Sequence, residues 1–379
     1  MKQNQTFVTR VVFFVGYGIE KDGHRGICGP ENRFFQSCRI LDSSIILPIV
    51  VYPTCGRLYK DFKQLNNEHQ IILIEYTPER RWDYVRILYH TLTRYSPHVI
   101  HCQGPHLFDT ISVSLGKLLN IRVIITRPVN ISQDHLKPFK RLLFRLNDQL
   151  IVRHANHLIA ISDTHKKQWE KELMPLSSFS IEKMKVIYNG IHLETFIPSS
   201  QIPDLNPVIF TICAQLTNVK GHKLLLHVAH QLYQKGYSFY LNILGDGPLR
   251  SELESIANTL NISSFVNFYG HVSDVSTVLK QTHVVVLPSL REGVSLALLE
   301  GMATGCPLIA SRVGASHELI DNGENGFLIQ KNNAMELLLA MKWFLDYPLT
   351  IQKMGQKSHL KSKKFDIYRM VDEYKALYL

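Results

Sequence analysis

The chain has 379 residues, of which 45% are hydrophobic and 20% are charged, and its formal net charge is +10. This composition excludes a disordered chain, and a length of about 150 residues per domain predicts two or three domains. No run approaches the roughly 18 consecutive apolar residues of a membrane-spanning helix, so no such helix is expected. The positive charge favours an anionic partner, such as nucleic acid, an acidic membrane or a phosphorylated substrate.

Short apolar runs alternate with helical patterns along the whole chain. In the first half we expect strands at 8–15, 45–51, 70–74, 98–101, 122–126 and 157–161. In the second half we expect them at 208–214, 239–244, 265–269, 283–287 and 307–310. Continuous Val, Ile and Leu runs are typical of parallel strands that helices cover on both faces. The alternation predicts an α/β fold with two doubly wound, Rossmann-like domains.

The first apolar run resembles a short signal peptide, because residues 11–15 follow Lys2 and Arg10. However, the charged residues 20–22 follow at once and no small-residue cleavage site appears, so we interpret the run as a buried strand. The six cysteines form no CxxC pair, which favours reduced thiols and a cytoplasmic protein.

The segment 198–207 is polar, contains three prolines and has no periodic pattern, which is typical of an interdomain linker. We therefore expect an N-terminal domain at 1–197, a linker at 198–207 and a C-terminal domain at 208–360. A helix at 361–379 is expected to pack back on the N-terminal domain. Ligands bind outside the carboxyl ends of such strands, so we expect the two domains to face a cleft that holds the site.

The most informative stretch runs from 284 to 303, where a hydrophobic strand, a turn with Glu292-Gly293 and a helix from about Val294 follow one another. The free N–H groups and dipole of a helix start bind anions, and Gly293 permits close approach of a ligand. Glu300 lies on the order of 12 Å from Glu292 if the span is helical. The two carboxylates could therefore hold the ribose and hexose of a nucleotide diphosphate sugar. Alternatively, Glu292 caps the helix dipole and Glu300 faces solvent.

Five motifs in sequence order resemble glycosyltransferase family 4: Lys220-Gly221, Gly245-Asp-Gly-Pro248, Phe268-Tyr-Gly270, Leu287-Pro-Ser289 and Glu292-x7-Glu300. The resemblance is close over about 187–329 and looser upstream. Members of this family are retaining, nucleotide-sugar-dependent enzymes with the GT-B fold. The resemblance therefore implies that the N-terminal domain binds the acceptor and the C-terminal domain binds the donor.

By this resemblance Glu292 faces the donor hexose, Glu300 faces the ribose and Lys220 contacts the diphosphate, where a cation offsets the charge of the leaving group. An ordinary surface lysine is the alternative for Lys220. We expect Glu292 and Lys220 to be the catalytic residues. The resemblance also implies backbone contacts to the nucleobase and to the phosphates. The full set of expected donor-binding residues is Gly29, Gln215, Gly245, Gly270, His271, Val272, Gly293, Val294, Ser295 and Glu300.

The sequence departs from the family pattern at two places. The family often has Gly-Arg-Leu where this chain has Ala214-Gln215-Leu216, and Gln215 carries no charge. The family also often has Thr-x-His where this chain has Thr126-Arg127-Pro128. Arg127 follows a predicted strand and could contact a phosphate or an acidic acceptor, or it could be a surface arginine.

Further acceptor-side residues are expected in the first domain. Gly29 ends a glycine-rich loop and would let the chain pass close to donor phosphate or acceptor, although a flexible loop without a ligand is the alternative. His101 and His106 could donate hydrogen bonds to sugar hydroxyls. They also raise the question of a metal site with Cys102, but the spacing of these residues does not match zinc ligands, and we expect no metal.

The segment 135–146 predicts an amphipathic helix without acidic residues. Lys137, Lys140, Arg141 and Arg145 lie within about 140° of its circumference, with leucines and a phenylalanine opposite. We expect the apolar face to lie in the core and the basic face to be solvated. Docking of the helix on an anionic inner-leaflet surface is the second reading, and the two can hold together.

Motifs of other function classes are missing. No Asp-x-Asp triplet suggests a metal-held diphosphate, no complete G-x-G-x-x-G suggests a nicotinamide cofactor, and no zinc finger, RNA-recognition signature or Walker sequence suggests nucleic acid. We therefore expect a cytoplasmic or inner-membrane-associated transferase without a cofactor. It would move a hexose from a nucleotide diphosphate sugar to a saccharide or lipid-linked saccharide in surface polysaccharide or lipopolysaccharide synthesis. The alternatives are a nucleotide-sugar epimerase on the same scaffold and a non-catalytic sugar binder.

Overall fold

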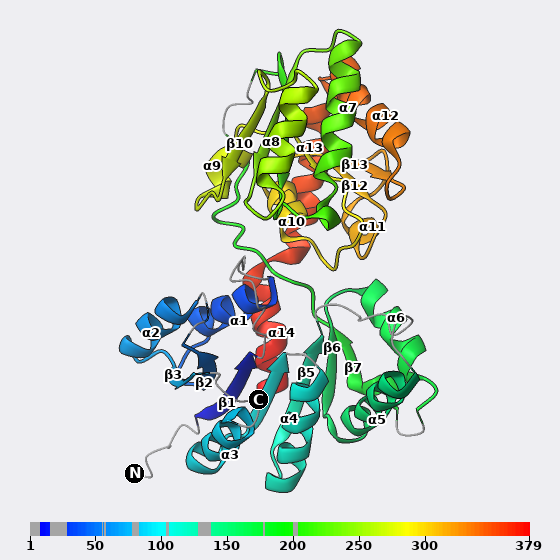
Figure 1. Ribbon diagram of the computed structural model, residues 1–379. Helices are drawn as coiled ribbons and strands as arrows, with labels where there is room; N and C mark the ends of the chain where they lie inside the picture. The colour runs from blue at the N-terminus through cyan, green and yellow to red at the C-terminus, as the bar shows by residue number, and fades with distance from the viewer. Residues whose placement is uncertain are drawn as a thin grey trace. The chain divides into compact units, whose positions relative to one another are not determined.

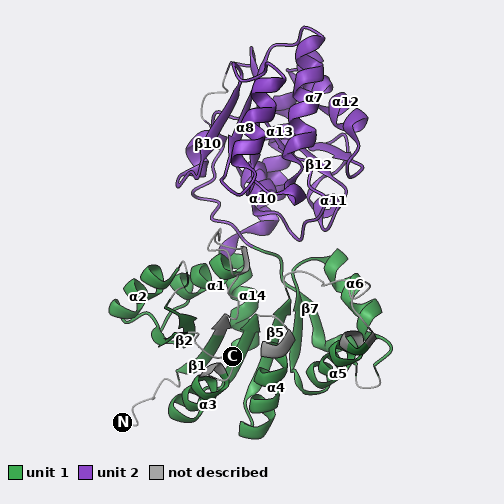
Figure 2. Ribbon diagram, in the orientation of Figure 1, with its two compact units in different colours: residues 1–189, 368–379 green, residues 190–367 purple. Residues whose placement is uncertain are grey.

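The computed structural model describes residues 8–15, 29–54, 56, 58–77, 83–103, 106–127, 138–176, 179–199 and 204–379. The chain forms two compact units (Figure 2), of which unit 1 contains residues 1–189 and 368–379 and unit 2 contains residues 190–367. The division after Asn189 differs from the expected linker at 198–207, which belongs to unit 2. The physical reason is that Ile191 pairs with Asp366 and accepts a hydrogen bond from the Ile367 N–H at 3.0 Å.

Unit 1 is built on a parallel sheet of seven strands in the order β3-β2-β1-β4-β5-β6-β7 (Figure 1). Its strands are β1 (Thr9–Val15), β2 (Ile46–Pro53), β3 (Ile72–Tyr76), β4 (Val99–Gln103), β5 (Arg122–Arg127), β6 (His157–Ala160) and β7 (Met184–Val186). The helical segments are α1 (Gly29–Ile40), α2 (Tyr59–Asn67), α3 (Asp83–Tyr95), α4 (His106–Leu119), α5 (Pro138–His154), α6 (Asp163–Leu173), η1 (Ile181–Lys183) and, from the C-terminus, α14 (Ile367–Tyr378). The strand order reverses between β1 and β4, as in doubly wound folds.

The first apolar run is a central strand, as expected. Val11, Val12 and Phe13 of β1 are fully buried, and β1 pairs in parallel with both β2 and β4. Continuous burial of this kind occurs when helices cover both faces of a parallel sheet. The short strand β7, which has three residues and contains Lys185, was not expected from the sequence.

The C-terminal helix α14 packs on the sheet of unit 1. The Tyr378 hydroxyl lies 2.7 Å from Nδ1 of His101, and the Tyr374 hydroxyl lies 3.2 Å from Oγ1 of Thr126. Arg122 donates hydrogen bonds to the carbonyls of Leu377 and Tyr378 near the end of the helix. The last helix therefore covers one face of the sheet through contacts between residues more than 240 positions apart in the chain.

Unit 2 has a parallel sheet of six strands in the order β10-β9-β8-β11-β12-β13. The strands are β8 (Val208–Cys213), β9 (Phe239–Leu244), β10 (Val266–Gly270), β11 (Val284–Leu287), β12 (Leu308–Ser311) and β13 (Gly326–Ile329). The helical segments are η2 (Asn218–Lys220), α7 (His222–Gln234), α8 (Arg250–Thr259), α9 (Val275–Leu279), α10 (Leu296–Ala303), α11 (Ser316–Leu319), α12 (Ala334–Asp346), α13 (Thr350–Ser362) and η3 (Lys363–Phe365). The order reverses between β8 and β11, and β13 was not expected from the sequence.

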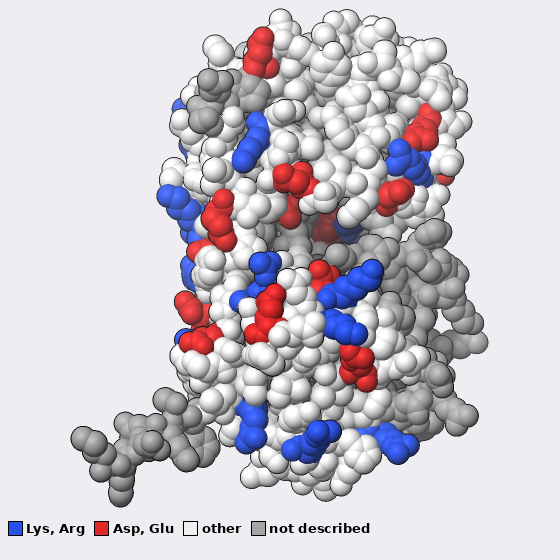
Figure 3. Space-filling model, turned by 90° about the vertical axis from the view of Figure 1, so that its left-hand side faces the viewer, with Lys and Arg blue, Asp and Glu red and all other residues white. Residues whose placement is uncertain are grey.

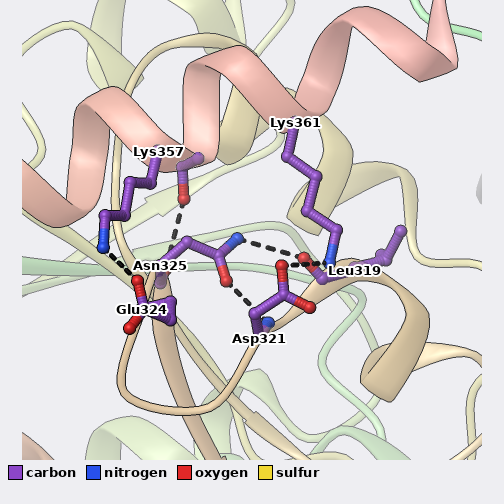
Figure 4. A network of polar contacts seen from close by, with 7 residues as sticks. Leu319, Asp321, Glu324, Asn325, Lys357 and Lys361 are labelled. Carbon is purple, nitrogen blue, oxygen red and sulfur yellow. Dashed lines mark hydrogen bonds and ion pairs between the residues drawn. The ribbon is translucent and has the colours of Figure 1, made fainter.

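A polar network fixes the turn before β13 to α13 (Figure 4). The Asn325 side chain accepts a hydrogen bond from the Asp321 N–H at 2.7 Å and donates one to the Leu319 carbonyl at 3.1 Å. Lys361 of α13 lies 2.8 Å from the Asp321 carboxylate, and Lys357 pairs with Glu324. These contacts hold the edge strand of the sheet in register.

The predicted amphipathic helix exists as α5, but the expectation that its apolar face lies in the core is wrong. Phe139 is 71% exposed and Leu142 is 55% exposed. The buried face of α5 consists instead of residues such as Asp148, Ile151 and Val152. The helix is anchored by this second face because a buried arginine, Arg127, pairs with Asp148.

Candidate functional site

The predicted donor-site residues follow four neighbouring strands of unit 2. Gln215 follows β8, Gly245 follows β9, His271 follows β10 and Glu292 follows β11. Ligands of open parallel sheets bind at this edge, next to the point where the strand order reverses. Lys220 and Glu292 come from the two connections that flank the reversal between β8 and β11. The structure therefore brings together residues that are more than 70 positions apart in the sequence.

A close backbone contact joins the two connections. Gly221 has a φ of +77° and follows Lys220 directly. A Cβ atom at Gly221 would lie 2.1 Å from the Pro288 carbonyl oxygen, so only glycine permits this approach. The Leu290 N–H donates a hydrogen bond to the Val219 carbonyl at 2.7 Å. The position of the Lys220 backbone is thereby fixed against the end of β11.

Lys220 and Glu292 form an ion pair. The Lys220 Nζ lies 2.7 Å from Oε1 of Glu292, and the Ser289 hydroxyl donates to the same oxygen at 2.7 Å. The Glu292 side chain is only 11% exposed and that of Lys220 is 27% exposed. An ammonium group has three donors, so this pair leaves Lys220 able to bind a phosphate oxygen as well. Lys220 is therefore not an isolated surface lysine, and the Glu292 carboxylate is bound to side chains.

The helix α10 begins at Leu296, two residues later than expected, and Ser295 is its N-cap. The Ser295 hydroxyl accepts a hydrogen bond from the Leu298 N–H at 3.4 Å. Among the described residues, no hydrogen bond uses the N–H of Gly293, Val294 or Ser295 as a donor. Such N–H groups before a helix favour an anion. That they hold donor phosphate stays a prediction.

Glu300 lies on α10 and is half-buried. Burial raises the pKa of its carboxyl group to about 7. Glu300 also lies near the end of β8, because its charge adds to the burial that raises the pKa of Cys213. The carboxyl group has no hydrogen bond or ion pair within the described part of the chain. A partly enclosed carboxyl group without a partner can accept hydrogen bonds from sugar hydroxyls, and it does not face open solvent.

Gly245 and Gly270 connect the ends of β8, β9 and β10. The Gly245 N–H donates to the Gly270 carbonyl at 2.8 Å, and a Cβ atom at Gly245 would lie 2.1 Å from the Ala214 carbonyl oxygen. Gly270 has a φ of +71°, and a Cβ atom there would lie 2.7 Å from the Arg250 guanidinium. Both glycines therefore have a structural function in shaping the edge. Contact of either one with the donor stays a prediction.

Gln215, His271 and Val272 lie at the same edge. The Gln215 and His271 side chains are exposed and that of Val272 is half-buried. Neither Gln215 nor His271 has a side-chain hydrogen bond to another described residue. These side chains are free to approach a ligand at the edge, and their role in donor binding stays a prediction.

The structure adds two residues that the sequence analysis did not assign to the site, Ser289 and Gly314. Ser289 belongs to the Leu287-Pro-Ser289 motif, so its place after a strand was a usable signal. A Cβ atom at Gly314 would lie 2.2 Å from the Glu292 carbonyl oxygen, and Ala315 donates a hydrogen bond to Gly293 at 3.0 Å. Gly314 follows the neighbouring strand β12, and nothing in its local sequence indicates this contact.

The expected acceptor-side role of His101 is not supported. His101 is fully buried, and its two ring nitrogens contact the hydroxyls of Tyr378 and Thr126 at 2.7 and 2.8 Å. Burial, and then the charge of Arg33, hold the pKa of His101 well below its ordinary value. His101 lies inside β4, which continues to Gln103, and α14 covers this part of the strand, which the local sequence does not reveal.

Arg127 also points inward and not toward solvent. It is 6% exposed, its Nη2 donates to Asp148 at 2.8 Å, and its Nε lies 3.6 Å from Asp109. The guanidinium carbon lies 4.8 Å from the ring centre of Trp169. Burial raises the pKa of Asp109 to about 7, against the opposing charge of Arg127. Both readings from the sequence, a ligand contact and a surface arginine, are replaced by a buried charge cluster.

Gly29 is the first residue of α1, and His106 is the first residue of α4. Each helix follows one of the two strands, β1 and β4, that flank the reversal of strand order in unit 1. The His106 side chain and the rest of the glycine-rich loop lie outside the described residues. The acceptor-side roles of Gly29 and His106 therefore stay predictions.

No helix in the described ranges is long and apolar enough to cross a bilayer. No group of three His, Cys, Asp or Glu side chains that could hold a metal ion occurs in the part of the chain that the structure describes.

Two family models match consecutive parts of the chain. Residues 48–195 match glycosyltransferase family 4, and residues 194–361 match the glycosyl transferases group 1. Their boundary lies within six residues of the division between the two units, after residue 189. Together the two matches include most of β2 and every strand from β3 to β13.

Curated proteins and solved structures give the same result. An Escherichia coli UDP-Gal:alpha-D-GlcNAc-diphosphoundecaprenol alpha-1,3-galactosyltransferase is 29% identical over 63% of this chain and 64% of its own. A putative colanic acid biosynthesis glycosyltransferase, WcaL of Escherichia coli, is 26% identical over 62% of this chain and 60% of its own, so the chain spans less than two thirds of the length of these relatives. The crystal structure of Anabaena HepE in complex with UDP covers 97% of this chain and 99% of its own with a TM-score of 0.80 at 18% identity, which shows a shared fold. The chain therefore belongs to glycosyltransferase family 4 and has the GT-B fold of two parallel-sheet α/β domains.

Proposed function

We propose that the chain is a retaining hexosyltransferase. It moves a hexose from a nucleotide diphosphate sugar to a hydroxyl of a saccharide or lipid-linked saccharide in surface polysaccharide synthesis. The observation that carries the proposal is the Lys220–Glu292 ion pair, which lies beside the N–H groups of residues 293–295 at the reversal of strand order. The similarity to a galactosyltransferase that uses UDP-Gal and a diphosphoundecaprenol-linked acceptor, and to a structure in complex with UDP, supports the proposal.

Each group of the site has a distinct task in this reaction. The N–H groups of residues 293–295 and the Lys220 ammonium bind the diphosphate and offset the charge that develops as it leaves. The Glu292 Oε1 already accepts hydrogen bonds from Lys220 and Ser289, which holds the carboxylate in place. Its second oxygen can then accept a hydrogen bond from a hexose hydroxyl and orient the sugar.

Retention of configuration follows from attack on the same face of the sugar as the leaving group. The bond between the anomeric carbon and the phosphate oxygen breaks while the acceptor oxygen bonds to that carbon. The departing phosphate oxygen takes the acceptor proton, so no separate base and no glycosyl ester on Glu292 is required. The ion pair with Lys220 supports this assignment, because it makes the Glu292 carboxylate a weaker nucleophile.

The experiment is transfer from UDP-, GDP- and ADP-hexoses with the variants Lys220→Ala and Glu292→Ala. Each variant should lose about 10²–10³-fold in transfer rate, the usual cost of removing one group that stabilises developing charge. Lys223→Ala is the matched control, since Lys223 forms an exposed ion pair with Glu252 on the same unit. Undiminished transfer by both site variants would refute the proposal. Product formed from the donor without any acceptor would instead favour an epimerase.

A further inference from the structure

An exposed apolar stripe runs along α5. Its residues are Phe139, Leu142, Leu143, Leu146 and Leu150, which are 71, 55, 45, 49 and 42% exposed. The spacing of three, four, seven and eleven positions from Phe139 places all five on one face of the helix. A continuous exposed apolar surface on a folded protein marks an interaction site more often than isolated exposed leucines do.

The stripe is not needed to hold α5 on unit 1. The opposite face of the helix carries Asp148, Ile151 and Val152, which are 5, 1 and 0% exposed. Asp148 is also bound by the buried Arg127 at the end of β5. The helix is therefore anchored by its buried face and an ion pair, and the apolar stripe remains available to a partner.

The charge of α5 identifies the kind of partner. Lys140, Arg141, Arg145 and Arg153 belong to the helix, and the Arg145 and Arg153 side chains are exposed. The one acidic residue of α5, Asp148, is buried against Arg127. Elsewhere, on the face drawn in Figure 3, basic and acidic side chains are interspersed, so the net charge of +10 is not gathered there. An apolar stripe bordered by arginines is complementary to an anionic lipid surface.

We propose that α5 docks unit 1 on an anionic lipid bilayer, with the apolar stripe in the interfacial region and the basic side chains at the headgroups. Long basic side chains can extend from such a helix to phosphate groups while their stems stay apolar. Docking on a bilayer deepens the proposed function, because a lipid-linked acceptor would be presented at the same membrane surface. In this respect alone the inference rests on the proposed function. The Arg127–Asp148 pair links the docked helix to the carboxyl end of β5.

The test is flotation of the full chain with vesicles of phosphatidylcholine alone or mixed with phosphatidylglycerol. The protein should float with the mixed vesicles and much less with the neutral ones. The double variant Leu142→Ser/Leu146→Ser should partition at least about tenfold less, because two apolar side chains no longer leave water. The matched control is Leu339→Ser/Leu360→Ser, in which two leucines of unit 2 that are 55 and 62% exposed are changed, and it should float like the unmodified chain.

A second variant separates charge from apolar insertion. Arg145→Gln should reduce flotation with the anionic vesicles and leave the weak binding to neutral vesicles unchanged. Equal flotation of the unmodified chain and the stripe variant, or equal binding to both vesicle types, would overturn the proposal. So would a dimer in sedimentation that dissociates in the stripe variant, since the stripe would then bind a second copy. Transfer to a water-soluble acceptor is measured in parallel, so that loss of lipid binding and loss of transferase activity are distinguished.

Discussion

Among the residues of the candidate site, Glu300 has a carboxyl group whose titration is expected to change the stability of the protein. Burial raises its pKa to about 7, far above that of a carboxyl group in water. The native state therefore holds the proton more tightly than the unfolded chain does. The stabilisation that comes from the protonated form is complete below the unfolded pKa and is lost as the pH rises through about 7.

Glu300→Gln should consequently make unfolding less sensitive to pH. At pH 4, below the unfolded pKa of about 4.3, the variant and the unmodified chain should have nearly the same free energy of unfolding, whereas at pH 8 the variant should be more stable by roughly 1–3 kcal/mol. Urea unfolding at both pH values measures this. Asp109, whose pKa is also raised to about 7, contributes equally to both proteins and cancels in the difference. A stability difference that does not change with pH would contradict the prediction, and Glu252→Gln at an exposed carboxylate is the control.

At the scale of elements, Arg127 connects β5 with its neighbours. It pairs with Asp109 of α4 and Asp148 of α5, and it lies over the ring of Trp169 in α6. Removing one partner of a buried ion pair leaves an uncompensated charge, which costs more than the pair itself contributes. The three helices are therefore coupled through a single guanidinium group.

Arg127→Met should destabilise unit 1 by about 3–5 kcal/mol, because it removes the cation and keeps the apolar stem. The loss should be smaller at pH 6 than at pH 8, since Asp109 without its cation takes up a proton more readily at the lower pH. Thermal unfolding of the variant at both pH values measures the effect. Arg369→Met, which breaks an exposed pair with Glu373, is the control and should cost less than about 1 kcal/mol. Equal costs in the two variants would show that the buried pair is not important.

At the scale of the whole molecule, the chain returns from unit 2 to unit 1 for its last twelve residues. Tyr374 and Tyr378 of α14 are 2 and 1% exposed, and they close the face of the sheet around His101 and Phe13. Unit 1 therefore becomes complete only when the end of the chain is present, whereas unit 2 is continuous in sequence.

Truncation after residue 367 should weaken unit 1 selectively. Removing two large buried aromatic side chains costs about 3–5 kcal/mol each, so unit 1 should unfold at a clearly lower temperature while unit 2 keeps its own. Calorimetry, together with hydrogen exchange of peptides from both units, measures the unfolding of unit 1 separately from that of unit 2. Removal of Leu379 alone, which is 62% exposed, should change neither transition. A uniform loss of protection in both units would contradict this division.

Much of the fold could be predicted from the sequence, because buried parallel strands appear as continuous apolar runs. The eleven expected strands are all present, and the two that were missed are short: β7 includes a lysine, and β13 begins with a glycine. The expected boundary between the units differs from the observed one, because a proline-rich segment has the composition of a linker whether or not it packs on a domain. Lys220 and Glu292 were predicted as site residues, but their direct pairing was not, because it depends on the contact of Gly221 with Pro288.

The sequence by itself determined the family, the alternation of strands and helices, and the residues that follow β8 to β11, because each of these is carried by local patterns and motifs. Only the tertiary structure decided which charged side chains are internal. From the sequence, Arg127 and His101 were expected at the ends of strands, where ligands bind, yet α5, α6 and α14 cover them. The exposure of the apolar stripe of α5 was likewise decided only by the tertiary structure. Helical periodicity defines the faces of a helix but not which face the rest of the protein covers.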